Sequence, residues 1–355
     1  MIDFRYHLVS IVAVFLALAI GIVVGSTALK PAVLSGLQTT ANAEKKRIDA
    51  LYATNGQLKQ QLGAAEAYAQ AGERVALQGL LDGQRVVLVT APGFPGGVVT
   101  GVSSALTQAG ATVTGQVQLQ SQFFAAGTQS DLDTRNRLLT PAGVTLRGGT
   151  PQAQASQLIA SAILTKNGPT DPPVGVADAA AKSILNGYAA GGFLSTSGNP
   201  AARATLAVVI IPGTPPATSA SGSTSSASQT LVTVAQQLNL TGNGTVLAGS
   251  LNGSGQGSAI DLLRSDGRSD HFSSVDDADY TIGQIVVAQA LYGQMTAGRS
   301  GNYGSLASAT AAAPSPAPTP SPSTTATSTA KQSATPKRTA RQSAHPDTTA
   351  SASAR

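Results

Sequence analysis

The chain has 355 residues, of which 42% are apolar, 11% charged and 4% aromatic, and this charge content is far below the ~25% typical of soluble domains. Highly charged disorder therefore does not describe the whole chain, and the absence of Cys excludes disulfides, thiolate metal sites and cysteine nucleophiles. The net charge of +5 arises mainly at the end of the chain, because residues 314–355 hold five Lys or Arg and one Asp. The remainder is almost neutral, so neither charge nor aromatic content favours nucleic-acid binding.

Residues 8–25 form an apolar segment in which Ser10 is the only polar side chain. A helix of this length reaches roughly 27 Å, close to the ~30 Å hydrocarbon core of a bilayer. We therefore expect residues 1–30 to be a membrane anchor, with a transmembrane helix at about 8–29 that ends before Pro31. A cleaved signal peptide is the alternative, although its apolar region is normally shorter. The charges that flank the segment do not decide its orientation.

Small residues recur at every fourth position of the apolar segment, which places Ala13, Ala17, Gly21 and Gly25 on one stripe of the predicted helix. Such a stripe lets a second helix approach closely. Ala and Gly are common in this chain, so chance spacing is the alternative.

A heptad pattern follows, and we expect residues 37–72 to form a coiled coil. The a positions are Ala41, Ile48, Asn55, Leu62 and Ala69, and the d positions are Glu44, Leu51, Leu58 and Ala65. An Asn at a central a position favours two parallel helices in one register. Because Glu44, the Ala residues and nearby Gly weaken the seam, an amphipathic helix that packs on the rest of the protein is the alternative.

Together these patterns predict a parallel homodimer whose dimer face consists of Ala17, Gly21, Gly25, Ile48, Leu51, Asn55, Leu58 and Leu62.

Apolar strands alternate with helical patterns after Gly72, which predicts an α/β domain over residues 73–304 with a mostly parallel sheet. The predicted strands cover residues 84–90, 111–119, 205–211 and 245–248, and the predicted helices cover 98–109, 151–165, 177–190, 229–238 and 281–295. Residues 212–228 are rich in Ser and Thr and predict an exposed insertion. Residues 305–355 are dominated by Pro, Ser, Thr and Ala, from which we expect a disordered tail.

No pattern indicates catalysis, so we expect no enzymatic activity and no bound cofactor. The turn Pro92-Gly93-Phe94-Pro95-Gly96-Gly97 follows a predicted strand but lacks the G-x-G-x-x-G spacing of a dinucleotide site, and the two prolines remove N–H donors. Neither G-K-[ST] nor G-x-S-x-G occurs.

The densest polar cluster is residues 266–279, with five Asp and His271. Carboxylates and an imidazole are potential metal ligands, but the spacing does not match an EF-hand. We expect instead that Asp277 or Asp279 caps the helix that begins near Tyr280. The side chains that copper prefers are scattered over the sequence as Met1, Met295, His7, His271 and His345, so no preformed copper cage is predicted.

Three motifs, in their order along about residues 1–304, resemble the mycobacterial copper-transport outer-membrane protein B (MctB) family of actinobacterial envelope proteins. They are Phe15-Leu16-Ala17-Leu18-Ala19 with Gly21 and Gly25-Ser26, then Ser274-Val275-Asp276-Asp277, then Gly301-Asn302-Tyr303-Gly304. This resemblance implies a protein of copper efflux and homeostasis, with copper as the transported ion. It also implies a pore in the outer membrane and a soluble part outside the cytoplasmic membrane.

The sequence itself favours one helical anchor with an extramembrane α/β body, because it lacks the alternating segments and aromatic girdles of an outer-membrane barrel. Two hypotheses therefore stand side by side: a transport component of copper homeostasis, and a single-pass coiled-coil scaffold of the cell envelope.

Overall fold

The first element of the computed structural model is one continuous helix, α1 (Phe4–Leu77). The structure describes residues 4–142, 144–166, 178–214, 226–266, 271–315 and 317, and for residues 27–34 the backbone alone. We expected the anchor helix to end before Pro31, and this prediction was wrong. A proline inside a helix removes one N–H donor and its ring clashes with the preceding turn, which kinks a helix without always ending it. Residues 4–26 of α1 are long and apolar enough to cross a membrane.

The body of the protein is built on a sheet whose described strands follow the order β3-β2-β1-β4-β5-β6-β7. Neighbouring strands are parallel, except that β2 and β3 are antiparallel. The strands are β1 (Arg85–Thr90), β2 (Thr112–Leu119), β3 (Leu194–Gly198), β4 (Leu206–Ile210), β5 (Gly244–Ala248), β6 (Ser273–Val275) and β7 (Asn302–Tyr303). The predicted α/β domain with a mostly parallel sheet is confirmed.

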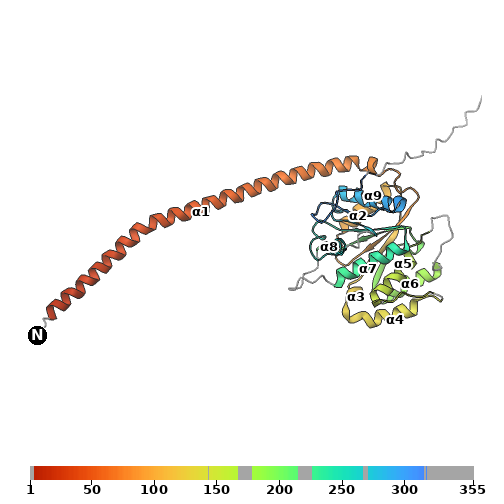
Figure 1. The fold of residues 1–355 in the computed structure, drawn as a ribbon, viewed down its shortest axis with the longest axis horizontal. Coiled ribbons are helices and arrows are strands. Elements are labelled where there is room, and N and C mark those ends of the chain that lie inside the picture. The colour runs from red at the N-terminus through yellow and green to blue at the C-terminus, as the bar shows by residue number, and fades with distance from the viewer. Residues whose placement is uncertain are drawn as a thin grey trace, which may run out of the picture. The chain divides into compact units, whose positions relative to one another are not determined.

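Helices cover both faces of the sheet, as Figure 1 shows. One face carries α2 (Gly96–Gln108), α9 (Thr281–Ala297) and the end of α1. The helices of the other face are α3 (Ser121–Phe124), α4 (Gln129–Leu139), α5 (Pro151–Ile163), α6 (Asp178–Ala190), α7 (Ser226–Thr241) and α8 (Ala259–Ser265). Two short 3-10 turns are η1 (Ala126–Thr128) and η2 (Pro200–Ala202). Alternation along the strands divides the core, since Val87 and Val89 join one cluster while Val86 and Leu88 join the other.

The expected Ser/Thr-rich insertion is shorter than residues 212–228. Its last three residues belong to the first turn of α7, where Ser228 is buried and its hydroxyl donates to the carbonyl oxygen of Gly257 at 2.8 Å. That contact lies 29 residues away along the chain, so composition alone gives no sign of it. The central part of the insertion, residues 215–225, lies outside the described residues.

The hydrogen-bonded structure continues past residue 304, where we expected the disordered tail to begin. The N–H of Ser305 donates to Asp276 at 2.8 Å, and Ala311 forms a bridge with Tyr303 at the edge of the sheet. Backbone pairing and a buried carboxylate therefore hold this segment in place. Composition does not predict that it is ordered, because the segment has few apolar residues. The rest of the expected tail, residue 316 and residues 318–355, lies outside the described residues.

Candidate functional site

The predicted dimer face of the helical region after the anchor lies on the exposed surface of α1. Leu51 is 70% exposed, Leu58 58%, Ile48 48% and Leu62 46%, and Asn55 is exposed between them. In the structure, residues 48–62 do not bury their apolar side chains against their own domain. Pairing needs a second helix, so the coiled coil stays a prediction.

The small-residue stripe of the anchor is open as well. Ala17 and Gly21 are exposed and Gly25 is half-buried. A Cβ atom added at Gly21 or Gly25 would have no heavy atom within 4 Å outside its own helix backbone and chain neighbours. The stripe thus has room for another helix, and nothing in this chain occupies it among the described residues.

Helix α1 is attached to the domain through Glu66. The Glu66 carboxylate accepts the backbone N–H of Thr281 at 2.9 and 3.1 Å and also accepts the Thr281 hydroxyl. These bonds satisfy one orphan N–H donor in the first turn of α9 and place a negative charge at the positive end of that helix. Beyond this contact, α1 continues onto the domain and ends with Leu77 fully buried.

The Glu66 contact corrects the expectation that Asp277 or Asp279 caps α9. The N-cap residue is Tyr280, whose side chain makes no capping bond. Asp279 accepts the N–H of Leu251 at 2.9 Å instead. The cap comes from a residue more than 200 positions earlier in the sequence, which local pattern rules do not reach.

The two C-terminal motifs noted in the sequence meet as the neighbouring strands β6 and β7. The N–H of Ser274 donates to the Gly301 carbonyl at 3.0 Å, and the Ser274 hydroxyl donates to the Asn302 side-chain oxygen at 2.9 Å. The N–H of Asp276 donates to the Tyr303 carbonyl at 3.3 Å. The motifs therefore form one structural unit at the edge of the sheet.

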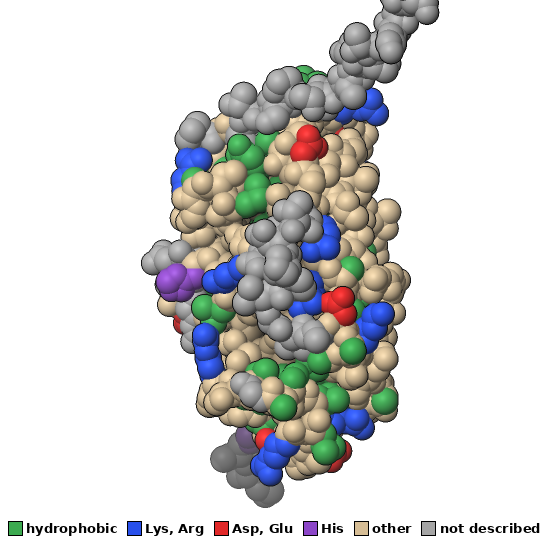
Figure 2. All heavy atoms as spheres, turned by 90° about the vertical axis from the view of Figure 1, so that its right-hand side faces the viewer, with side chains coloured by type: hydrophobic (Ala, Val, Ile, Leu, Met, Phe, Trp, Pro, Cys, Tyr) green, Lys and Arg blue, Asp and Glu red, His purple; other side chains and the backbone are tan. Residues whose placement is uncertain are grey.

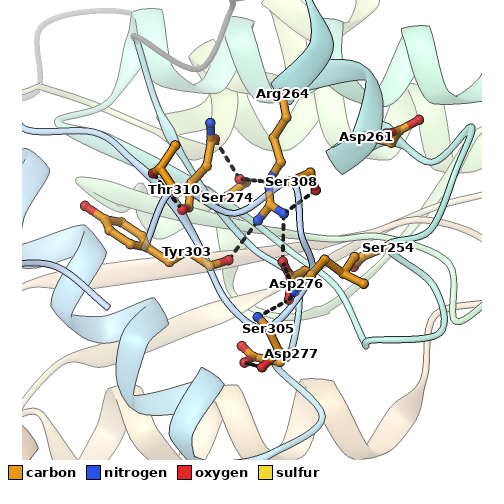
Figure 3. Close-up of polar contacts among 12 residues, drawn as sticks. Ser254, Asp261, Arg264, Ser274, Asp276, Asp277, Tyr303, Ser305, Ser308 and Thr310 are labelled. Atoms are coloured by element: carbon orange, nitrogen blue, oxygen red, sulfur yellow. Dashed lines mark hydrogen bonds and ion pairs between the residues drawn. The ribbon is translucent and has the colours of Figure 1, made fainter. Parts of the chain in front are cut away.

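Arg264 from α8 lies at the centre of this unit, and Figure 3 shows its guanidinium reaching both motifs. Its side chain is 3% exposed and forms an ion pair with the fully buried Asp276 at 2.7 Å. The same guanidinium donates to the Ser274 hydroxyl at 2.9 Å, the Ser308 hydroxyl at 2.9 Å and the Tyr303 carbonyl at 2.8 Å. Because each guanidinium nitrogen has an acceptor partner and the charges are compensated, this network fixes the residue 302–311 segment against β6.

The Asp276 carboxylate lies so close to Gly304 that it leaves no room for a side chain at position 304. Gly304 has φ +128, and a Cβ atom there would lie 2.2 Å from the Asp276 carboxylate. Glycine is the residue that meets both the backbone and the contact requirement. Both oxygens of Asp276 accept hydrogen bonds, Oδ2 from Arg264 and Oδ1 from the backbone N–H groups of Ser305 and Leu306.

Among the described carboxylates of the cluster, Asp277 has a buried oxygen without a hydrogen-bond partner. Its side chain is 5% exposed, its Oδ2 accepts the Ser305 hydroxyl at 2.7 Å, and its Oδ1 has no hydrogen-bond partner in the described structure. Burial raises the pKa of Asp277; the Ser305 bond opposes this shift, while the neighbouring Asp276 charge adds to it. A Cβ atom added at Gly283 would lie 2.6 Å from Asp277 Oδ1, so helix α9 closes the space around that oxygen.

The carboxyl edge of the sheet, where doubly wound folds bind ligands, is closed at the switch point between β1 and β4. The N–H of Gly213 after β4 donates to the carbonyl of Gly93 after β1 at 3.0 Å, which joins the two loops directly. Helix α2 then begins at Gly96 without a side-chain cap. The proline-rich turn at residues 92–97 thus starts a helix and contacts the neighbouring loop.

The side chains that could serve as copper ligands do not converge. His7 lies on the exposed anchor and Met295 is half-buried on α9, while Met1 and His345 lie outside the described residues. His271 borders a cavity of about 460 Å³ with Gln236, Gln237, Asn239, Leu240, Phe272 and Gly298. Within the described part of the chain, no group of three or more His, Cys, Asp or Glu could hold a metal ion.

Charged groups are also dispersed on the face of the domain that Figure 2 presents, where Lys and Arg side chains are spread over the surface with acidic ones between them. On that face the basic side chains do not gather into one patch.

Sequence reasoning missed Glu66 and Arg264, the two charged residues with the most specific tertiary roles. Glu66 is one of several polar residues on an amphipathic helix, and Arg264 is one of two basic residues near the Asp cluster. A usable signal was the Asp276-Asp277 dipeptide, because a carboxylate that is buried needs a cationic partner.

Comparison with known proteins identifies relatives along nearly the whole described length. A family model described as "Copper transport outer membrane protein, MctB" matches residues 1–314. Proteins named copper transporter MctB from Mycobacterium tuberculosis and Mycobacterium bovis are each 30% identical over 310 residues, which covers 86% of this chain and 96% of theirs. The protein of that name from Mycobacterium leprae is 30% identical over 319 residues, covering 87% of this chain and 98% of its own. Matches of this extent show that the chain belongs to the MctB family of copper transport outer membrane proteins.

Proposed function

We propose that this chain is a membrane-anchored protein of the cell envelope that takes part in copper homeostasis, with copper ions as the exported species. The observation that carries this proposal is the family match over residues 1–314 together with relatives named copper transporter MctB. The match includes the anchor, the helical region and the α/β domain, so the proposal concerns the whole assembly rather than one module. The chain is not an enzyme in this proposal, and nucleic acid is not a partner.

The placement that we propose is a single pass through the membrane by residues 4–26, with the α/β domain outside the cytoplasmic membrane. The length and hydropathy of that part of α1 support a spanning helix. The orientation rests on the family resemblance, because the flanking charges give no clear bias.

The role of this chain in copper export is indirect in our proposal. Copper prefers thiolate, thioether and imidazole ligands, and the described residues offer no converging set of them. Asp276 is already satisfied by Arg264, and the space beside Asp277 is filled by α9. We infer that the domain organises an assembly through which copper passes and does not itself hold the ion tightly.

The second candidate function is a single-pass envelope scaffold without transport activity. The exposed apolar residues on α1 favour it, because they offer a surface for assembly whatever the cargo. Both candidate functions use the same anchor and domain, so they differ only in whether copper export depends on the protein.

The test is the copper content and copper tolerance of a strain that lacks the protein. We expect the deletion strain to accumulate copper under copper load and to grow less well, and the full chain to restore both. Zinc content serves as the matched control and should not change. Unaltered copper content and tolerance would contradict the copper proposal and favour the scaffold.

A second measurement separates indirect from direct action. We expect the purified full chain to lose Cu(I) readily to a competing chelator, because it lacks a soft-ligand cluster. A tight stoichiometric site would contradict the indirect role while leaving the copper function in place.

A further inference from the structure

Helix α1 carries an apolar seam that its own domain leaves uncovered. The seam consists of the exposed residues Leu37, Ala41, Ile48, Leu51, Asn55, Leu58 and Leu62. They follow the alternating three- and four-residue spacing of a coiled-coil contact, with the single gap at Glu44. The seam ends where α1 docks on the domain, because the carboxylate of Glu66, the next polar residue after it, is bound to Thr281.

We propose that the seam pairs in parallel with the same seam of a second copy of this chain, and that the small-residue stripe of the anchor is not part of this contact. The proposal is independent of copper and rests on α1 alone.

The position of Asn55 favours a second copy of this chain as the partner of the seam. It is the one uncharged polar residue within the run of apolar a and d positions from Ile48 to Leu62. An amide that faces its own counterpart can donate to it and accept from it, and this happens only when the two helices are parallel and in register. Facing an apolar partner helix, the same amide would be buried without a hydrogen bond, which is costly.

The large apolar side chains of the seam supply part of the area that such a pair needs. Full burial of a large aliphatic side chain removes on the order of 60–120 Å² of apolar surface, at ~1.5–3 kcal/mol and ~25 cal/mol per Å². Leu37, Ile48, Leu51, Leu58 and Leu62 are 46–70% exposed on α1, so two copies supply roughly 300–700 Å². Specific interfaces bury ~1,200–2,000 Å², so the flanking side-chain stems and Ala residues must supply the remainder.

The continuity of α1 separates the seam from the membrane stripe. Gly21 and Asn55 are on one unbroken helix and are 34 positions apart. At 3.5 to 3.6 residues per turn their side-chain directions differ by roughly 100–180°. A parallel pair that buries Asn55 therefore turns Gly21 away from the contact, and the same pair cannot use both faces.

Disulfide crosslinking tests the pairing in native membranes, since the chain has no Cys of its own. Asn55→Cys places thiols at facing a positions, where Cβ atoms come near the ~3.5–4.5 Å that a disulfide needs. Ala53→Cys is the matched control, because position 53 is on the outer side of the same turn and is also exposed. We expect mild oxidation to give a dimer of the chain for Asn55→Cys and little for Ala53→Cys.

Three further experiments identify the partner of the seam. Two differently tagged copies of the chain should co-purify. The double variant Leu51→Asp with Leu58→Asp should abolish this co-purification, and Gly21→Ile should leave the co-purification unchanged. Equal crosslinking at positions 53 and 55, or none at 55 in membranes that contain the protein, would overturn the proposal. A crosslink from position 55 to a different protein would assign the seam to another partner, and loss of pairing in Gly21→Ile would assign it to the stripe.

Discussion

Arg264 is the residue whose loss we expect to be most damaging to the domain. It is buried, pairs with the buried Asp276 and bonds to three further groups on β6, β7 and the segment that follows. Removing one partner of a buried pair leaves an uncompensated charge, which typically costs ~3–5 kcal/mol. We expect Arg264→Leu to lower the free energy of unfolding of the full chain by about that amount, as measured by denaturant titration followed by circular dichroism.

The matched control for Arg264 is Arg137→Leu. Arg137 pairs with Asp133 at 2.5 Å, but its side chain is 79% exposed. Exposed helix pairs are worth only ~0.3–0.5 kcal/mol, so the control should be nearly neutral. Similar losses for both variants would mean that the Arg264 network does not hold the sheet edge.

Asp277 should make stability depend on pH in the opposite sense to an ordinary salt-bridged carboxylate. Burial raises its pKa in the folded protein, the Ser305 hydrogen bond partly offsets this, and the Asp276 and Asp279 charges add to the increase. The folded state therefore binds this proton more tightly than the unfolded state does. The stabilisation that comes from the protonated Asp277 is fully present at a pH below the ordinary carboxyl pKa. It is lost as the pH rises through the raised pKa of Asp277 in the folded protein.

We expect Asp277→Asn to stabilise the protein at neutral pH and to lose that advantage in acid, because an amide has no charge to bury and can still accept the Ser305 hydroxyl. Thermal denaturation of both proteins across the acid to neutral range measures the difference. Asp131→Asn, at an exposed position, is the control. A difference that grows toward acid pH would contradict the assignment.

At the scale of elements, the joint between α1 and α9 depends on the Glu66 carboxylate. Losing an N-terminal cap costs ~0.5–2 kcal/mol, and the charge at the helix end contributes part of this. We expect Glu66→Ala to increase amide hydrogen exchange in the first turn of α9, beginning at Thr281, and Glu66→Gln to have a smaller effect because its side-chain oxygen still accepts. Asp49→Asn removes an exposed carboxylate elsewhere on α1 and should change nothing.

Unchanged exchange at Thr281 in Glu66→Ala would mean that another group, or water, caps α9. In that case the end of α1 would be held by its apolar contacts alone, of which Leu77 is the most deeply buried.

At the scale of the whole molecule, the orientation of the anchor determines on which side of the membrane the domain lies. If residues 4–26 are retained in the membrane with their C-terminal side outside, protease added to spheroplasts should digest the domain while a fragment with the N-terminus stays in the membrane. An N-terminal tag followed by immunoblotting measures this. Release of an intact body that begins near Lys30 would establish a cleaved signal peptide instead.

Some features of this protein follow from its sequence alone because they rest on periodicity and composition. The apolar run at residues 8–25, the heptads after it and the strand–helix alternation predict the anchor helix, a second helical segment after it and a mostly parallel sheet. Periodicity works here because a helix face or a strand face repeats its burial every few residues. The position of the exposed seam on α1 is also readable in this way, since its residues are spaced along one helix.

Tertiary structure alone decided the features that join distant segments. Glu66 caps α9, Arg264 pairs with Asp276, and residues 305–311 return to the edge of the sheet through bonds that no local window contains. The short strands β3, β6 and β7 exist because neighbouring strands supply their hydrogen bonds, and their polar sequences show no strand pattern of their own. A buried charge or a short edge strand is stable only with its partner, and the sequence does not specify which distant residue that partner is.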